Sequence, residues 1–182
     1  ALPIFNYYNS SIKMENINNK KGFTLVELIL YVAIGSIVLL VITSFFQTNL
    51  SSRAKIKAIS EVDQQGAYLM QTITQTIVNA EAINSPSIGT SATPLSLDVV
   101  DVADDPTLFN NISTYIYLTE GVATPIALNS NLVEVSNLSF TNMSKVSTPG
   151  NIRIQFDISF VNNTNRNEYD WTKTFYGSAS LR

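Results

Sequence analysis

The sequence contains no cysteine and no histidine among its 182 residues. Disulfides, thiol chemistry and His-based metal sites are therefore excluded, together with the Ser–His and Cys–His arrangements of nucleophilic catalysis. Charged residues are also scarce, at 14%, and the formal net charge is −3. Because no basic patch is present, the charge does not support nucleic acid as a partner. We do not expect an enzyme.

Proline is absent between Pro3 and Pro86. Within this stretch, residues 23–46 are apolar except for Glu27 and scattered Thr and Ser. At a rise of 1.5 Å per residue, such a run forms about 36 Å of helix, enough to cross a hydrocarbon core of about 30 Å. The run predicts one transmembrane segment. The lysines just before it, at positions 20 and 21, favour keeping its N-terminal end in the cytoplasm.

Residues 47–84 are more polar but keep a helical periodicity. Their apolar side chains recur three, four or seven positions apart, as one face of a helix requires: Ile59, Val62, Leu69, Ile73, Ile77 and Ala80. Since no proline interrupts, we expect one continuous helix from about Thr24 to about Asn84, stopped by the sequence NSPS. Gly35 and Gly66 are weak points within this helix.

From residue 85 onward the sequence predicts β-strands. Residues 151–160, NIRIQFDISF, alternate apolar and polar side chains, as a strand with one buried face requires. Further strands are expected in SLDVVDV, STYIYL, NLVEVSNLSF and EYDWTKTFYGSASL, with turns at DDP, TEG and STPG. No helix intervenes, so the strands should form an antiparallel sheet covered on one face by the apolar stripe of the helix. The expected fold class is α+β.

Glu27 lies just inside the apolar run. A carboxylate at the centre of a membrane helix costs about 2.5–3.5 kcal/mol on insertion scales, and less near the interface. Ionisable groups inside a membrane usually have a partner, so a plain membrane anchor leaves Glu27 unexplained. A secretory signal peptide also fits poorly, because its apolar region usually has about 7–15 residues and a small-x-small cleavage site should follow.

The segment KKGFTLVELILYVAIGSIVLLVITSFF resembles the class III signal of type IV pilins and of the pseudopilins of type II secretion. In that family a prepilin peptidase cuts after the glycine, here Gly22, and the new N-terminal residue, here Phe23, is N-methylated. Lys20 and Lys21 correspond to the basic residues of the leader. Glu27 would be the fifth residue of the mature chain and would pair with the N-terminal amine of a neighbouring subunit. The resemblance implies no cofactor.

The resemblance also implies a division of the chain. Residues 1–22 would be a leader that is removed, with its natural start at Met14. Residues 23–46 would be the transmembrane and assembly half of a pilin-like helix, and residues 47–84 its amphipathic half. Residues 85–182 would form a β-rich globular head. Within the head, NLVEVSNLSFTNMS, GNIRIQFDISF and TKTFYGSASLR resemble the J-like minor pseudopilins.

The partners that the resemblance implies are the prepilin peptidase, sister pilins or pseudopilins, the inner-membrane assembly platform, and membrane lipid before assembly. The chain would be a single-pass protein of the cytoplasmic (inner) membrane with its head outside the cytoplasm, and later part of an extracytoplasmic filament. We expect a structural subunit, a minor pilin or pseudopilin of a type IV pilus or a type II secretion pseudopilus. Two alternatives stay open: a tip minor pilin whose head binds DNA or surfaces, and an anchored surface protein that never assembles.

Three groups of head residues have a second interpretation. The acidic residues Asp98, Asp101, Asp104 and Asp105 lack the spacing of a calcium loop, so we expect a solvated turn and no metal site. Aromatic side chains could stack on a ligand, but on strands they pack more often across the sheet; these are Tyr115, Tyr117, Trp171, Phe175 and Tyr176. Glu120, Glu134 and Asp157 form no paired-carboxylate motif, and no catalytic residue is expected.

Overall fold

The computed structural model describes residues 22–182. The chain separates into two compact units, Ala1–Phe45 and Phe46–Arg182. The long helix α1 (Leu25–Asn79) contributes its first turns to the first unit and the rest to the second. The predicted start at Met14 lies outside the described residues.

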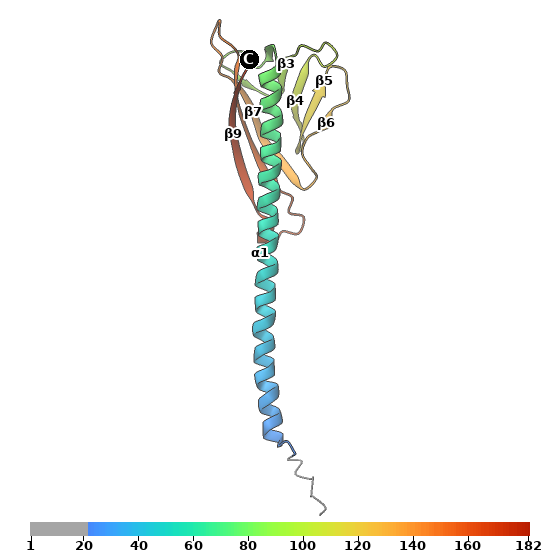
Figure 1. Cartoon of the computed structure of the whole chain (residues 1–182), viewed down its shortest axis with the longest axis vertical. Coiled ribbons are helices and arrows are strands. Elements are labelled where there is room, and N and C mark those ends of the chain that lie inside the picture. Colours follow the sequence, from blue (N-terminus) through green and yellow to red (C-terminus); the bar gives the residue numbers. More distant parts are fainter. Residues whose placement is uncertain (1–21) are drawn as a thin grey trace, which may run out of the picture. The chain divides into compact units, whose positions relative to one another are not determined.

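The described residues of the second unit form two antiparallel sheets (Figure 1). One sheet has the order β1-β3-β4-β5-β6, with β1 (Ala82–Ser85), β3 (Leu95–Asp98), β4 (Thr107–Ile112), β5 (Tyr115–Glu120) and β6 (Ile126–Ala127). The other has the order β2-β7-β8-β9, with β2 (Ser91–Ala92), β7 (Val133–Asn142), β8 (Asn151–Phe160) and β9 (Thr172–Ser180). A short 3-10 helix, η1 (Asn167–Tyr169), precedes β9. The predicted α+β class is confirmed.

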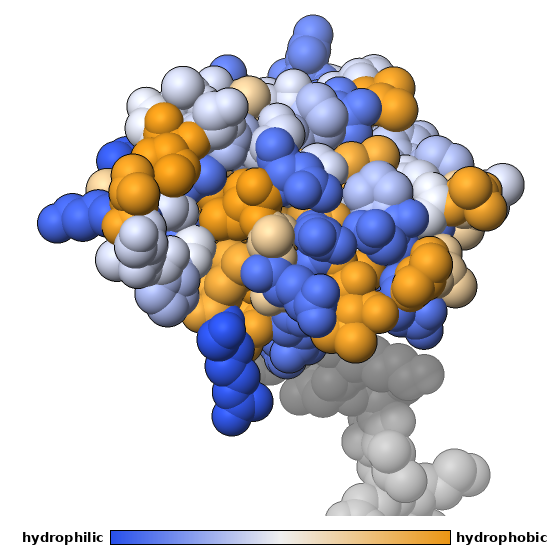
Figure 2. All heavy atoms as spheres, turned by 90° about the horizontal axis from the view of Figure 1, so that it is seen from above, coloured by the Kyte–Doolittle hydropathy of each residue, from blue (hydrophilic) through white to orange (hydrophobic). Residues whose placement is uncertain are grey.

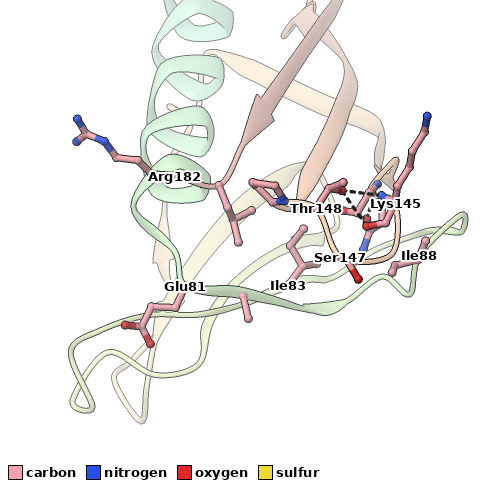
Figure 3. Close-up of a pocket in the computed structure, with 13 residues that line it drawn as sticks. Glu81, Ile83, Ile88, Lys145, Ser147, Thr148 and Arg182 are labelled. Atoms are coloured by element: carbon pink, nitrogen blue, oxygen red, sulfur yellow. Dashed lines mark hydrogen bonds between the residues drawn. The ribbon is translucent and has the colours of Figure 1, made fainter.

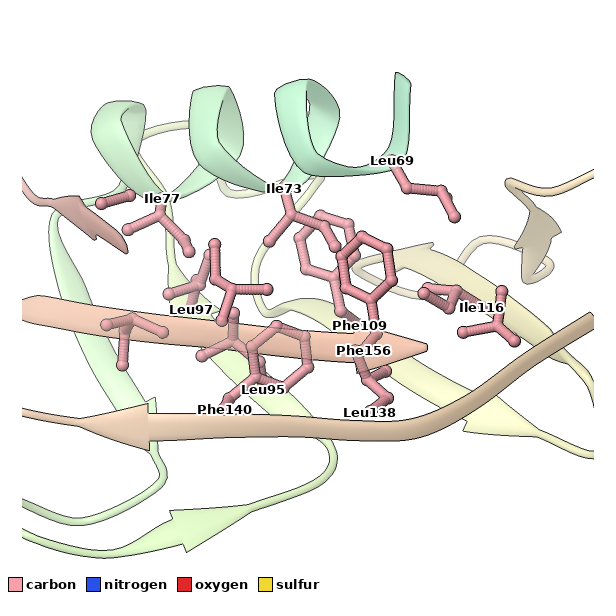
Figure 4. Close-up of a cluster of buried hydrophobic side chains, with 14 of the residues drawn as sticks. Leu69, Ile73, Ile77, Leu95, Leu97, Phe109, Ile116, Leu138, Phe140 and Phe156 are labelled. Atoms are coloured by element: carbon pink, nitrogen blue, oxygen red, sulfur yellow. The ribbon is translucent and has the colours of Figure 1, made fainter. Parts of the chain in front are cut away.

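One stripe of α1 packs on these sheets. Its buried residues recur every three or four positions, which places them on one face of the helix; they are Ala58, Val62, Gly66, Leu69, Ile73 and Ile77. Figure 4 shows Ile73 and Ile77 pointing from the helix toward side chains of the strands, among them Phe109 and Phe156. The predicted apolar cover is therefore confirmed, although Ile59, which we placed in the stripe, is only half-buried.

Strand β8 matches its prediction residue for residue. It pairs with β7 on one side and β9 on the other, so it is an inner strand of its sheet. The side chains of Ile152, Ile154, Phe156 and Ile158 are buried, while Arg153 between them is exposed. This alternation follows from the pleat of a strand, which directs successive side chains to opposite faces.

The predicted helix end at Asn84 is wrong. Helix α1 ends at Asn79, and β1 begins three residues later. Strand β1 pairs antiparallel with β3, with Ile83 opposite Leu97. Its backbone groups therefore bond to the sheet, which competes with continued helix. Ile83 packs against the core from the strand, so its apolar side chain is consistent with either structure and could not locate the boundary.

The expectation of a single sheet of about five strands is also wrong. Short strands β1, β2 and β6 were not predicted, nor was β4, whose sequence TLFNNI contains two asparagines that are uncommon in strands. The strand predicted in EYDWTKTFYGSASL begins later than expected, because Glu168 and Tyr169 belong to η1. Short strands carry too few residues to show an alternating pattern.

Gly66 lies where α1 and β9 approach each other. A Cβ added at this position would overlap the ring of Phe175. The Phe175 ring in turn stacks on Phe156, with ring centroids 5.5 Å apart and planes 16° apart. Gly66 therefore lets an aromatic ring of the sheet lie directly against the helix backbone, which offsets the unfavourable helix propensity of glycine.

We predict that Gly66→Val lowers the free energy of unfolding of the second unit by about 1–3 kcal/mol, the usual cost of overpacking a core. Ala67→Val is the matched control, because Ala67 is the exposed neighbour on the same helix; its effect should stay within about 0.5 kcal/mol. Urea unfolding of both variants, followed by the fluorescence of Trp171, measures the difference. Equal stability of the two variants would contradict the close packing of Phe175 on Gly66.

Candidate functional site

Helix α1 begins within the segment GFTLVE. The backbone N–H of Leu28 donates to the carbonyl oxygen of Thr24 at 3.1 Å, and that of Glu27 donates to Thr24 Oγ1 at 3.3 Å. Thr24 is therefore the N-cap, whose hydroxyl satisfies one of the N–H groups left free in the first turn. Threonine followed three residues later by glutamate is also the spacing of a capping box. This signal is present in the sequence, although the capping role of Thr24 was not predicted from it.

The side chain of Glu27 is sheltered by its own helix. Every residue from 22 to 50 is exposed except Glu27, which is half-buried. Tyr31 Oη donates a hydrogen bond to Glu27 Oε1 at 3.3 Å, and the rings of Tyr31 and Phe23 meet edge to face with centroids 5.9 Å apart. A negative charge in the first turn is also stabilised by the helix dipole. Glu27 is thus held at the start of the helix by its immediate neighbours.

The residue before the expected cleavage, Gly22, is accessible to solvent. Gly22 is exposed, and a Cβ added to it would meet nothing within 4 Å. A hollow of about 400 Å³ lies beside it, lined by Gly22, Phe23, Thr24 and Glu27. The fold therefore leaves room for a larger side chain at position 22. The predicted leader residues Lys20 and Lys21 lie outside the described part of the chain.

The apolar part of α1 is suited to a lipid environment. The large apolar side chains of residues 25–45 are between 50% and 75% exposed. The hydroxyls of Ser36 and Thr43 donate to backbone carbonyl oxygens one turn earlier, both at 2.8 Å, so burial in lipid would leave neither hydroxyl without a partner. Among the described residues, α1 is the helix that is long and apolar enough to cross a membrane.

The acidic residues after β3 organise a turn. Asp101 Oδ1 accepts a hydrogen bond from the N–H of Ala103, and its carbonyl oxygen accepts one from the N–H of Asp104, both at 3.0 Å. Asp101 and Asp105 are exposed. Within residues 22–182, no group of three or more acidic side chains is placed to hold a metal ion.

The aromatic residues of the strands differ in their surroundings. Phe175 pairs with Phe156 across β8 and β9, so the predicted cross-strand packing is confirmed for Phe175. Tyr176, the next residue, is 65% exposed, because successive side chains of a strand point to opposite faces. Three others are half-buried: Tyr115, Tyr117 and Trp171.

A hollow of about 360 Å³ lies at one end of the second unit (Figure 3). It is lined by β1, by the loop between β7 and β8, and by the last residues of the chain. Figure 3 shows the charged side chains of Glu81, Lys145 and Arg182 pointing in different directions away from the hollow. The hollow therefore lacks the continuous positive groove by which proteins hold single-stranded nucleic acid.

The surface at this end is mixed in character. Seen from above in Figure 2, hydrophobic side chains form several small areas separated by hydrophilic ones. Broad apolar patches are the usual mark of a docking surface. The face in Figure 2 carries no such patch, so it does not point to one particular protein partner.

Residues 17–43 match the family model described as the prokaryotic N-terminal methylation motif. This motif is the class III signal of type IV prepilins and pseudopilins, and it includes Gly22, Phe23 and Glu27. Neither the curated proteins nor the solved structures include a match to the chain. The chain thus carries a prepilin signal at the start of a pilin-like α+β fold. The motif supports a structural subunit related to type IV pilins or pseudopilins.

The carboxylates that we examined as a possible catalytic pair lie on separate strands: Glu120 on β5, Glu134 on β7 and Asp157 on β8. Asp157 is engaged in the sheet, since its Oδ2 accepts a hydrogen bond from Asn137 Nδ2 at 2.7 Å. Asn137 lies at a bulge of β7, with a left-handed φ of 53° that asparagine tolerates. Hydrogen bonds from Asn137 and Thr174 lower the pKa of Asp157 below its ordinary value of 3.8.

A carboxyl whose pKa is lowered by folding stabilises the folded state above its ordinary pKa, and this contribution is lost as the pH falls through the folded-state pKa. We therefore predict that Asp157→Asn makes unfolding less sensitive to acid between about pH 5 and about pH 2. Urea unfolding at a series of pH values measures this slope. Asp105→Asn, which changes an exposed carboxylate, is the control. An unchanged slope for Asp157→Asn would show that its hydrogen bonds do not favour the charged form.

Proposed function

We propose that the chain is the precursor of a filament subunit, a minor pilin or pseudopilin. A prepilin peptidase cuts it after Gly22, Phe23 is N-methylated, and the mature chain assembles into a type IV pilus or a type II secretion pseudopilus. Its partners are the peptidase, sister subunits and the assembly platform of the inner membrane. Before assembly, the apolar half of α1 holds it in the membrane with the second unit outside the cytoplasm.

The observation that carries this proposal is the coincidence of the prepilin signal with a sheltered carboxylate. The matched residues 17–43 end before the second unit begins, so the signal belongs to the part that would be processed and inserted. Among residues 22–43 of that part, Glu27 is half-buried and the others are exposed. An ordinary membrane anchor needs neither a glycine–phenylalanine junction nor a carboxylate one turn beyond it.

Cleavage after Gly22 would create the partner that Glu27 requires. It releases an α-amine on Phe23, and such amines have a pKa of about 7.7–8.0 in model compounds, so most carry a positive charge at neutral pH. In a filament core, this ammonium of one subunit would pair with the Glu27 carboxylate of its neighbour. Removing one member of a buried pair leaves an uncompensated charge, which costs about 3–5 kcal/mol. The pair would therefore fix the register of neighbouring helices.

The apolar residues of α1 would serve two environments in turn. In the membrane their exposed side chains contact lipid, and in the filament the same side chains would contact the helices of sister subunits. This exchange needs no refolding of the second unit, whose core is formed without residues 25–45. The segments that resemble the J-like minor pseudopilins include the strands β7, β8 and β9, and this resemblance supports a minor subunit.

We predict that Gly22→Leu yields an uncut precursor in cells that contain the prepilin peptidase. The structure leaves space for the new side chain, so folding and membrane insertion should be normal and only processing should fail. Mass spectrometry of the N-terminus distinguishes an uncut chain from one that begins with methylated Phe23. Normal cutting of Gly22→Leu would overturn the processing step. A wild-type chain that keeps its leader would favour an anchored protein that never assembles.

We predict that Glu27→Ala is inserted and cut normally but enters filaments at least about 100-fold less than the wild type, as expected when a buried ammonium loses its partner. The measurement is the amount of the chain in sheared filaments relative to the membrane fraction. Ser36→Ala is the control, because it changes an exposed polar residue in the same apolar stretch of α1. This variant should assemble normally. Wild-type incorporation of Glu27→Ala would refute the pairing role.

A further inference from the structure

Tyr31 is the polar neighbour of Glu27 on the helix. It follows Glu27 by four residues, the spacing that places two side chains one above the other on the same helix face. Its Oη donates to Glu27 Oε1 at 3.3 Å, and its ring lies against the ring of Phe23. Tyr31 therefore contacts both residues that the proposed assembly step uses. No role was predicted for Tyr31 from the sequence.

The two polar groups need each other in an apolar environment. A carboxylate and a phenol hydroxyl are both costly to bury without a hydrogen-bond partner. The hydroxyls of Ser36 and Thr43 donate to backbone carbonyl oxygens one turn earlier, whereas the Tyr31 hydroxyl donates to the Glu27 carboxylate. Without competing water, even a long hydrogen bond of this kind limits the positions that the carboxylate adopts.

We propose that Tyr31 is a positioning residue for Glu27. Before assembly, while the chain is in the membrane, the Tyr31 hydroxyl holds the carboxylate at the start of the helix. The Tyr31 ring fixes the side chain of Phe23 through their edge-to-face contact. Glu27 lines one hollow with Phe23 and Thr24, both of which remain after cleavage, so its carboxylate would stay accessible to the amine of a neighbouring subunit. This inference rests on the proposed pairing of Glu27 with that amine.

The ring and the hydroxyl of Tyr31 make separable contributions. Tyr31→Phe removes only the hydroxyl and keeps the edge-to-face contact with Phe23, whose planes meet at 73°. Tyr31→Leu removes both and keeps the helix apolar. A comparison of the two variants therefore assigns any effect to the hydrogen bond or to the aromatic contact.

The test uses the full-length chain in phosphatidylcholine vesicles and dicyclohexylcarbodiimide, an apolar reagent that modifies carboxyl groups within the membrane. Mass spectrometry measures the rate at which Glu27 is labelled at a fixed neutral pH. A hydrogen bond between side chains in a membrane contributes about 0.6 kcal/mol, so Tyr31→Phe should label about threefold faster than the wild type. A rate equal to that of the wild type would overturn the proposal.

Two controls accompany this measurement. Tyr68→Phe removes a hydroxyl from an exposed tyrosine farther along α1 and should leave the labelling rate of Glu27 unchanged. A threefold change in Tyr68→Phe as well would show a general effect of tyrosine and would overturn the specific role of Tyr31. In Glu27→Gln the label at position 27 should disappear, which identifies the modified group.

The proposed function and the positioning role of Tyr31 can be contradicted separately. If Glu27→Ala enters filaments normally, the proposed function fails whatever Tyr31 does. If Glu27→Ala is excluded from filaments while Tyr31→Phe is labelled at the wild-type rate, only the positioning role of Tyr31 fails. If Tyr31→Phe is labelled faster and also enters filaments about threefold less, as loss of one membrane hydrogen bond predicts, both stand.

Discussion

The packing of one helix face against two sheets is the interaction on which the second unit depends. The five-stranded and the four-stranded sheet bury their apolar faces in a single cluster, and the stripe of α1 that includes Leu69, Ile73 and Ile77 completes it. Each fully buried leucine or isoleucine contributes about 1.5–3 kcal/mol. Removing the helix would expose the inner faces of both sheets. The close approach of Phe175 to Gly66 shows how tightly that contact is made.

The start of the same helix is subject to a different constraint. There, apolar side chains are exposed on every side and a single carboxylate must be tolerated among them. Within residues 22–182, local interactions meet this constraint: the N-cap hydroxyl of Thr24, the favourable end of the helix dipole, and the Tyr31 hydroxyl one turn on. These groups reduce the cost of the Glu27 charge without neutralising it. In the proposed filament, the amine of a neighbouring subunit would supply the opposite charge.

Prediction from sequence succeeded where a long regular pattern had one interpretation. The four buried apolar residues of β8 alternate with polar ones, and only a strand with one buried face produces that pattern. It failed where a side chain suits two structures. Ile83 continues the helical spacing yet packs on the core from β1, so pairing with Leu97 decided the boundary. Strand β4 was not predicted, because its two asparagines are residues typical of loops.

The sequence by itself determined the prepilin signal, the apolar run and part of one buried helix face (Val62, Leu69, Ile73 and Ile77), because these depend on order and spacing along a chain. Tertiary structure alone decided that the strands divide into two sheets and that the ring of Phe175 packs against Gly66. It also decided that Asn137 donates a hydrogen bond to Asp157 at a bulge. Such contacts join residues far apart in sequence, and many pairings are compatible with the same local pattern. Only the free energy of packing all of them together selects one.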